Sequence, residues 1–370
     1  MSQRRIVVVV GTRPEAIKMA PVIHALKRSK QFACQVVATA QHRELLDQAL
    51  WEFAIEPDLD LDMMRANQSL CALTSRLLTR FEETLLEWRP DAVLAQGDTT
   101  TVLAVALSCF YLRIPFGHVE AGLRTGDMAN PFPEELNRTM ASRIARWHFA
   151  PTQKARDNLL REGIAEHAIH VTGNTVIDAL LHSLGQPHEA DPASRGDQRL
   201  LLVTLHRRES FGAPLLGICA AIRSLVERNE DIRVVFPVHP NPNVKVPVEA
   251  ALGGHPRIEL CPPLGYHRFI RMMKSAYLVL SDSGGIQEEA PALGIPVLVL
   301  RNETERQEAI EHGMVKLVGT RSADIVQAVQ HLLDDASHYA GMIRQESPYG
   351  DGRAAERIVQ VLAEHFSTCA

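Results

Sequence analysis

The sequence has few cysteines, no long apolar run and no excess of positive charge, and each shortage excludes a class of protein. The six cysteines lie far apart and never form a C-x-x-C pair, which argues against a zinc site or a disulfide scaffold. The longest apolar stretch, residues 102–112, is too short to span a bilayer. The net charge of −5 argues against binding of duplex nucleic acid. We therefore expect a cytoplasmic protein that binds neither nucleic acid nor membrane.

Glycine is scarce where a dinucleotide site would need it. The buried strand expected at 6–10 runs into "GTRPEAIK", which has one glycine where a dinucleotide-binding loop has three. A G-x-G-x-x-A match at 350–355 follows no strand and lacks the context of such a loop. The sixteen histidines include no H-E-x-x-H motif, and His167 and His170 are expected to be a surface pair. We therefore predict no metal and no cofactor.

Apolar β-branched runs alternate with helical patterns along the chain, which is typical of α/β proteins with parallel sheets. Strands are predicted at 6–10, 34–39, 91–95, 115–119, 147–150, 200–204, 232–238, 277–281 and 295–300, and helices at 14–29, 69–88, 99–112, 134–145, 214–229, 284–293 and 322–334. The polar segment 184–198 marks a flexible connection. We predict two Rossmann-like domains facing across a cleft: residues 1–173, with the C-terminal helix 354–370 packing back on them, and residues 174–353.

Two predicted helix entrances have features of a phosphate site. Arg13 and Lys18 lie at the start of the first helix, where backbone N–H groups and two cations would attract a diphosphate. The turn Ser283-Gly284-Gly285 precedes another helix and can present N–H groups without side-chain interference, and an acid beside it, such as Glu289, can accept ribose hydroxyls. Read alone, Arg13 and Lys18 would be two solvated surface cations. The second entrance favours a diphosphate site.

Acidic residues follow three successive strands or helix entrances of the first domain. They are Asp98, Glu120 and Glu134. Each alone could be a helix cap, but the carboxyl ends of parallel strands converge, and crowded carboxylates are suited to proton transfer. In the second domain, His206 ends a strand and could contact phosphate or transfer a proton.

Ten stretches occur in the order seen in one enzyme family. They are "GTRPEAIKMAP", "TAQHRELLDQ", "GDTTT", "GHVEAGLRTGD", "PEELNR", "TGNTVIDAL", "HRRESFG", "PVHPNPNV", "DSGGIQEEAP" and "SPYGDGRA". Together they resemble the non-hydrolysing UDP-N-acetylglucosamine 2-epimerases over nearly the whole chain. The resemblance implies a GT-B fold with UDP in the cleft, an isomerase of polysaccharide biosynthesis, and a homodimer.

The resemblance also implies roles for individual residues. The implied catalytic residues are Asp98, Glu120, Glu134 and His206, and the implied substrate contacts are Arg13, Lys18, Asp98, Glu120, His206, Phe269, Ser283, Gly284, Gly285, Glu289 and Arg306. Bacterial members can bind a second UDP-N-acetylglucosamine as activator, and Gln41, Arg207 and His239 lie in the matching stretches.

The implied reaction needs an unusual route, because carbon 2 of the sugar has no neighbouring carbonyl to acidify its C–H bond. Without a hydride carrier, the remaining hypothesis is elimination of UDP to 2-acetamidoglucal, followed by re-addition after a proton reaches the opposite face. The expected product is UDP-N-acetylmannosamine. A 2-epimerase for a related UDP-acetamido sugar and a GT-B glycosyltransferase stay open as alternatives.

Overall fold

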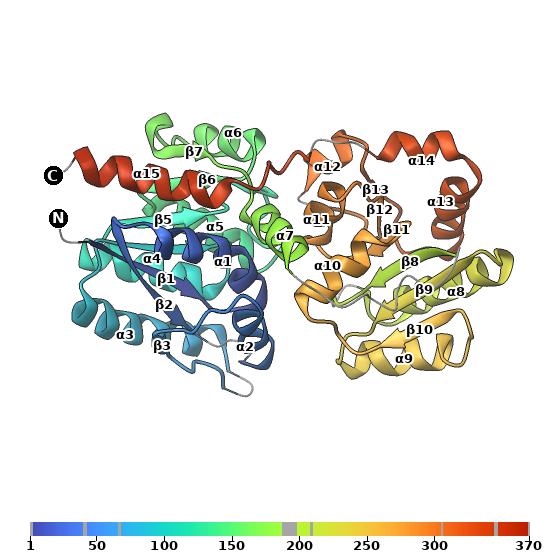
Figure 1. Cartoon of the computed structure of the whole chain (residues 1–370). Helices are drawn as coiled ribbons and strands as arrows, with labels where there is room; N and C mark the ends of the chain where they lie inside the picture. The colour runs from blue at the N-terminus through green and yellow to red at the C-terminus, as the bar shows by residue number, and fades with distance from the viewer. Residues whose placement is uncertain are drawn as a thin grey trace. The chain divides into compact units, whose positions relative to one another are not determined.

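The computed structural model describes residues 3–39, 43–65, 68–186, 198–207, 210–304, 306–343 and 347–368. The chain forms two compact units: unit 1 comprises Met1–His182 with Tyr349–Ala370, and unit 2 comprises Ser183–Pro348. Within each unit, helices alternate with strands along the chain (Figure 1). No helix in the described part of the chain is long and apolar enough to cross a bilayer.

Unit 1 contains a seven-stranded sheet whose neighbouring strands are all parallel, in the order β3-β2-β1-β4-β5-β6-β7. The strands are β1 (Arg4–Val10), β2 (Phe32–Ala38), β3 (Leu59–Asp60), β4 (Ala92–Gln96), β5 (Phe116–Val119), β6 (Trp147–Ala150) and β7 (Ile169–Val171). The helices are α1 (Arg13–Arg28), α2 (Arg43–Glu52), α3 (Leu70–Trp88), α4 (Thr100–Leu112), α5 (Glu134–Ile144), α6 (Gln153–Arg161), η1 (Glu166–Ala168), α7 (Thr175–Gly185) and α15 (Ala354–Thr368).

Unit 2 contains a six-stranded parallel sheet in the order β10-β9-β8-β11-β12-β13. The strands are β8 (Arg199–Thr204), β9 (Ile232–Pro237), β10 (Ile258–Cys261), β11 (Leu278–Ser281), β12 (Val297–Val299) and β13 (Val315–Leu317). The helices are α8 (Ala213–Arg228), α9 (Pro242–Leu252), α10 (Tyr266–Lys274), α11 (Ile286–Ala292), α12 (Gln307–Glu311), α13 (Ser322–Asp334) and α14 (Ala336–Met342). Both sheets therefore confirm the predicted α/β class with two Rossmann-like domains.

The central strands are apolar along their whole length because helices cover both faces of each sheet. In β1, Ile6 and the four valines that follow are at most 1 % exposed. Helix α1 contacts both α2 and α15, and helix α4 contacts both α3 and α5. These two groups are the helical layers of unit 1, which Figure 1 shows with α15 lying close to β6. The core of each unit is thus a sheet between helices.

Each sheet has a point where the strand order reverses, so that strands earlier in the chain lie on one side of it and later strands on the other. In unit 1 this point lies between β1 and β4, and in unit 2 it lies between β8 and β11. Loops at the carboxyl ends of such strand pairs form the usual ligand crevice of open α/β sheets. The segments that begin at Gly11, Gly97, Leu205 and Asp282 follow these four strands. The topology therefore locates the candidate site residues without reference to their chemistry.

The division of the chain differs from the expected boundary after residue 173. The backbone N–H of Asn174 donates to the carbonyl of Tyr349 at 2.7 Å, and the carboxylate of Asp178 accepts hydrogen bonds from Ala354 and Ala355 at 3.1 and 2.9 Å. These bonds tie the first part of α7 to the returning chain and so to unit 1. The returning helix α15 buries Ile358 and Leu362 completely within that unit.

Four strands that the sequence pattern did not predict are β3, β7, β10 and β13. They are the outer strands of the two sheets, and they are two, three, four and three residues long. His170, which was expected only as part of a surface pair with His167, lies within β7. An outer strand has one neighbour and often alternates in polarity, so its sequence is short and less apolar.

Candidate active site

Glu120 is the most constrained carboxylate of unit 1. It follows β5 with a φ of 63°, a left-handed conformation that residues other than glycine seldom adopt. Its side chain is 5 % exposed and accepts hydrogen bonds from Lys18 Nζ at 2.6 Å and from Asn174 Nδ2 at 2.9 Å, both on Oε1. The other oxygen accepts a hydrogen bond from Gln96 Nε2. Three donors, from α1, β4 and the segment before α7, thus hold one carboxylate and fix its direction.

Asp98 lies in the loop after β4 and is linked to the start of α5. Its Oδ2 forms an ion pair with Nη2 of Arg138 at 2.6 Å, and its backbone carbonyl accepts a hydrogen bond from Asn137 Nδ2 at 2.9 Å. Arg138 is buried, whereas the Asp98 side chain is 30 % exposed, so solvent or a ligand can reach the carboxylate. Glu134 is the first residue of α5 and is half-buried. The loops that carry the three predicted acids are therefore joined by direct bonds.

A further carboxyl group, Glu15, lies beneath the first loop and was not predicted as a site residue. It closes the capping box of α1: its Oε2 accepts from the N–H groups of Gly11 and Thr12 at 2.5 and 3.2 Å. Burial raises the pKa of Glu15 to about 7, a hydrogen bond from Thr99 opposes the shift, and the nearby charge of Asp98 adds to it. Glu15 can therefore exchange a proton near neutral pH.

The two predicted cations of α1 have different surroundings. Arg13 is the first helical residue and is half-buried, while Lys18 is only 6 % exposed and lies against Glu120. The Lys18 ammonium neutralises the Glu120 carboxylate of unit 1, and its predicted contact with a diphosphate stays a prediction. A solvated surface position for Lys18 is excluded by its burial.

In unit 2, Asp282 and His206 meet between β8 and β11. His206 Nδ1 lies 3.1 Å from Oδ1 of Asp282, and the Asp282 carboxylate also accepts from the N–H groups of His206 and Arg207 and from Ser210 Oγ. Burial would raise the pKa of Asp282, but these hydrogen bonds and the adjacent imidazole hold it below its ordinary value. The His206 side chain is 45 % exposed. Asp282 therefore orients an imidazole whose Nε2 can meet a ligand.

The turn Ser283-Gly284-Gly285 lies next to this pair and under Arg306. A Cβ atom at Gly284 would lie 2.8 Å from Cζ of Arg306, so the guanidinium rests directly over the turn. Arg306 Nε bonds to the buried Glu288 Oε1 at 3.1 Å, which fixes the guanidinium. Backbone N–H groups at the start of a helix beside a fixed guanidinium are suited to a phosphate.

Polar and aromatic groups extend this region along α10 and α11. Glu289 is 7 % exposed and accepts a hydrogen bond from the hydroxyl of Tyr266 at 2.8 Å. Phe269 lies on α10 and is half-buried. His239 follows β9, and its Nδ1 accepts the N–H of Asn241 at 3.2 Å. Of the candidate activator residues, Gln41 lies outside the described residues.

The structure also contains residues that the sequence pattern did not single out. Gln96, Asn174, Asp282 and Tyr266 each bond to a predicted site residue or hold its loop. Two of them stand in the motif stretches "TGNTVIDAL" and "DSGGIQEEAP", which was the available signal. In the described part of the chain, no group of three or more His, Cys, Asp or Glu side chains is arranged to hold a metal ion.

These features define an α/β protein of the GT-B type with a carboxylate-rich site in one unit and a phosphate-type site in the other. The family model for UDP-N-acetylglucosamine 2-epimerase matches residues 24–363. The chain therefore belongs to the UDP-N-acetylglucosamine 2-epimerase family, and epimerases are isomerases.

Individual relatives are similar over almost their whole length. The UDP-N-acetylglucosamine 2-epimerase of Escherichia coli K12 is 50 % identical over 368 residues, covering 97 % of this chain and 98 % of the relative. The crystal structure of the Neisseria meningitidis enzyme bound to UDP-GlcNAc has a TM-score of 0.92 at 44 % identity and covers 97 % of this chain and 100 % of that chain. The Methanocaldococcus jannaschii enzyme in complex with UDP-GlcNAc and UDP has a TM-score of 0.82 at 34 % identity, covering 97 % and 99 %.

Proposed function

We propose that the protein interconverts UDP-N-acetylglucosamine and UDP-N-acetylmannosamine, with unit 1 supplying the proton-transfer groups and unit 2 binding UDP. The observation that carries this proposal is Glu120, a buried carboxylate in a left-handed conformation with three hydrogen-bond donors around it. Strained, fully oriented carboxylates are characteristic of catalytic positions. The similar structures bound to UDP-GlcNAc support the same assignment of substrate.

The proposed reaction begins with loss of UDP from carbon 1. The C1–O bond breaks, its electron pair leaves with UDP, and a carboxylate removes the proton from carbon 2 to give 2-acetamidoglucal. A proton then reaches carbon 2 from the opposite face, and UDP adds again at carbon 1. Asp98, Glu120 and Glu134 are the proposed proton carriers.

Unit 2 is proposed to stabilise the departing diphosphate. Its negative charge would be met by the imidazole of His206, the guanidinium of Arg306 and the N–H groups of Ser283–Gly285. Asp282 holds the imidazole and Glu288 holds the guanidinium, so neither group needs to reorganise as charge develops. Glu289 and Phe269 are proposed to contact the ribose and the uracil. Arg13, at the start of α1, is proposed to contact the substrate.

The test is the reaction in deuterated water. The product should carry deuterium at carbon 2, and long incubation should release UDP and 2-acetamidoglucal. Glu120→Gln and Glu134→Gln should lose most of their turnover, on the order of 100-fold or more, while keeping UDP affinity. Product that retains its original hydrogen at carbon 2 would exclude the elimination route. A panel of UDP-acetamido sugars decides which sugar is the best substrate.

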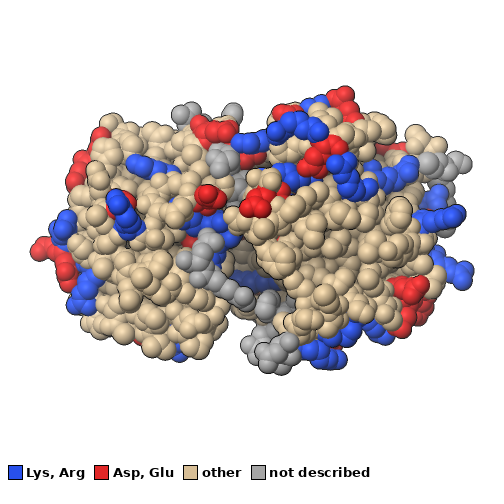
Figure 2. All heavy atoms as spheres, turned by 180° about the vertical axis from the view of Figure 1, so that it is seen from behind, with Lys and Arg blue, Asp and Glu red and all other residues tan. Residues whose placement is uncertain are grey.

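We also propose a homodimer formed through the α3, α4 and α5 face of unit 1. A hollow of about 640 Å³ lies there, and Leu70, Phe132, Leu136 and Met140 are 42–69 % exposed. Figure 2 shows a broad area without charged side chains over this unit. Exposed apolar patches of this kind usually mark protein interfaces. Light scattering should give a dimer for the wild type and a monomer for Phe132→Lys with Leu136→Lys.

A second UDP-N-acetylglucosamine is proposed as activator, near Arg207 and His239 at the carboxyl edge of the unit 2 sheet. The two residues follow the neighbouring strands β8 and β9, which supports a common ligand. Initial rates should then depend sigmoidally on substrate concentration, and His239→Ala should make the dependence hyperbolic. The product is proposed to feed polysaccharide biosynthesis.

A further inference from the structure

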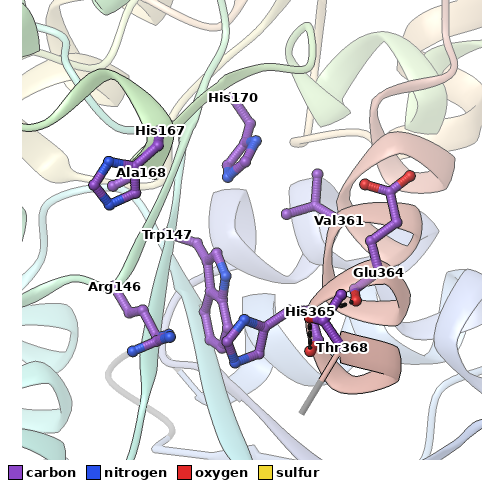
Figure 3. Close-up of a pocket in the computed structure, with 9 residues that line it drawn as sticks. All are labelled: Arg146, Trp147, His167, Ala168, His170, Val361, Glu364, His365 and Thr368. Atoms are coloured by element: carbon purple, nitrogen blue, oxygen red, sulfur yellow. Dashed lines mark hydrogen bonds between the residues drawn. The ribbon is translucent and has the colours of Figure 1, made fainter.

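We propose that unit 1 has a second ligand site, which binds a small dianion of the phosphate class between β6, β7 and α15. The chain forms a hollow of about 360 Å³ there, lined by Arg146, Trp147, His167, His170, Glu364 and His365 among others (Figure 3). The volume lies within the range of small-molecule pockets. This site is independent of the proposed epimerase function.

The hollow is remote from the candidate active site in the topology of the sheet. Arg146 and Trp147 stand at the amino end of β6, whereas Asp98 and Glu120 follow the carboxyl ends of β4 and β5. Because all strands of this sheet are parallel, the residues of the hollow lie at the amino ends of the strands and the candidate catalytic acids at the carboxyl ends. A ligand in the hollow would therefore leave the candidate active site open.

The basic groups around the hollow have unused hydrogen-bond donors. The guanidinium of Arg146 stacks on the Trp147 ring, with Cζ 5.6 Å from the ring centroid. No hydrogen bond or ion pair joins the side chain of Arg146, His167 or His170 to another described residue. His365 packs edge-on against Trp147 at 5.0 Å between ring centroids. One guanidinium and three imidazoles thus line one hollow (Figure 3).

Glu364, the single carboxylate that lines the hollow, bonds within its own helix and accepts from none of these groups. Glu364 Oε1 accepts a hydrogen bond from Gln360 Nε2 at 2.8 Å on the same helix. The neighbouring acid Glu166 is engaged by Arg156. An anion with several oxygens would match the donors of Arg146, His167 and His170, since charge-assisted bonds of this type are the strong ones.

Binding of a dianion here should be linked to protonation. Burial lowers the pKa of His170, where His148 and His167 add to the shift and Glu364 opposes it. Burial and the charge of Arg146 lower the pKa of His365. Both imidazoles are therefore neutral at neutral pH, and an anion beside them would raise their pKa values. The complex takes up protons, so binding strengthens as the pH falls.

The charged and titratable groups that face the imidazoles come from every neighbouring element. They are Arg146 just before β6, His148 in β6, His167 in η1, His170 in β7, and Glu364 and His365 in α15. His148 is bonded to the carbonyls of Ser142 and Ala168, so it does not turn toward the hollow.

The experiment is calorimetric titration of the full chain with inorganic phosphate and with sulfate, which stays a dianion at both pH values, at constant ionic strength near pH 6 and near pH 7.5. We expect sulfate binding that is several-fold tighter at the lower pH, with proton uptake seen as a dependence of the heat on the buffer. Arg146→Gln and the double variant His167→Gln with His170→Gln should each weaken it about tenfold or more. In NMR spectra, phosphate should shift the ring-proton signals of His167, His170 and His365.

Two matched variants serve as controls. His338→Gln changes an imidazole that packs against His331 in unit 2, and Arg80→Gln changes a surface guanidinium on α3, so both should bind phosphate like the wild type. Glycerol 3-phosphate is titrated in parallel: equal affinity would identify a phosphomonoester site, and loss of affinity a site for free phosphate. Wild-type binding that is absent, independent of pH, or unchanged in Arg146→Gln overturns the proposal.

Discussion

Asn174 joins the returning chain of unit 1 to Glu120. Its side-chain Nδ2 donates to Glu120 Oε1 at 2.9 Å, while its backbone N–H donates to the carbonyl of Tyr349 at 2.7 Å. Its own Oδ1 accepts the N–H of Val176 at the start of α7, which sets the orientation of the amide. The direction of the Glu120 carboxylate therefore depends on a residue 54 positions away in the sequence.

Asn174→Ala should lower the turnover number roughly 10- to 100-fold and leave UDP affinity almost unchanged. The variant removes one hydrogen-bond donor to the buried carboxylate of Glu120, so the orientation of that carboxylate is less constrained. The UDP contacts proposed for unit 2 stay unchanged. Steady-state kinetics and calorimetric titration with UDP measure the two effects. Asn229→Ala, which changes an amide at the end of α8, is the matched control. Equal losses in turnover and UDP affinity would contradict a positioning role.

Gly284→Val should weaken UDP binding by about tenfold or more. A Cβ at this position would lie 2.8 Å from Cζ of Arg306, so the guanidinium has to leave the turn and the proposed diphosphate site. Gly341→Val is the control, because a Cβ at Gly341 meets nothing within 4 Å. Unchanged UDP affinity in Gly284→Val would show that Arg306 does not act at this turn.

Glu15→Gln should change how stability depends on pH. Burial raises the pKa of Glu15 to about 7 from an ordinary value of 4.5, so between these values the folded state binds more protons than the unfolded state. Wild-type stability therefore falls as pH rises through this window, by roughly 3 kcal/mol for the full shift. The variant cannot ionise and should lack this decline in urea denaturation series. Glu83→Gln, at an exposed ion pair, should keep it.

Asp282→Asn should destabilise unit 2 by about 3 kcal/mol at neutral pH. In the wild type, the N–H groups of His206 and Arg207 and the Ser210 hydroxyl share two carboxylate oxygens, whereas the amide of the variant offers them only one oxygen. The folded-state pKa of Asp282 is depressed, so its extra stability is present above the ordinary pKa and is lost as pH falls below about 4. The difference between wild type and variant should shrink there. Asp324→Asn, at a partly exposed ion pair with Arg321, should have little effect at any pH.

The sequence pattern predicted the interior of both sheets and not their edges. Each of the nine predicted strands corresponds to an interior strand, whereas β3, β7, β10 and β13 are all outermost. Interior strands of a parallel sheet are buried on both faces, so they appear as continuous apolar runs. Outer strands are held by pairing to one neighbour, and segments such as "IHV" or "VKL" give no distinct pattern.

The chemistry of the site was predictable only where a residue follows a strand. Asp98, Glu120 and Ser283 could be located in this way, since chain position fixes which sheet edge they reach. Their bonding partners could not, because pairs such as Asp282 with His206 are 76 residues apart in the sequence. The burial of Lys18 could not be predicted either. Nothing in "GTRPEAIK" distinguishes it from the exposed cation that its position on a helix suggests.

Unit 2 is an uninterrupted segment inserted into unit 1, and this order has a consequence for biosynthesis. Residues 183–348 leave the ribosome before α15, whose Ile358 and Leu362 are fully buried in unit 1. Unit 1 therefore completes its fold only after unit 2 has been synthesised, since part of its apolar surface stays uncovered until α15 emerges. We expect nascent chains stalled just after Pro348 to contain a protease-resistant unit 2 beside a protease-sensitive unit 1.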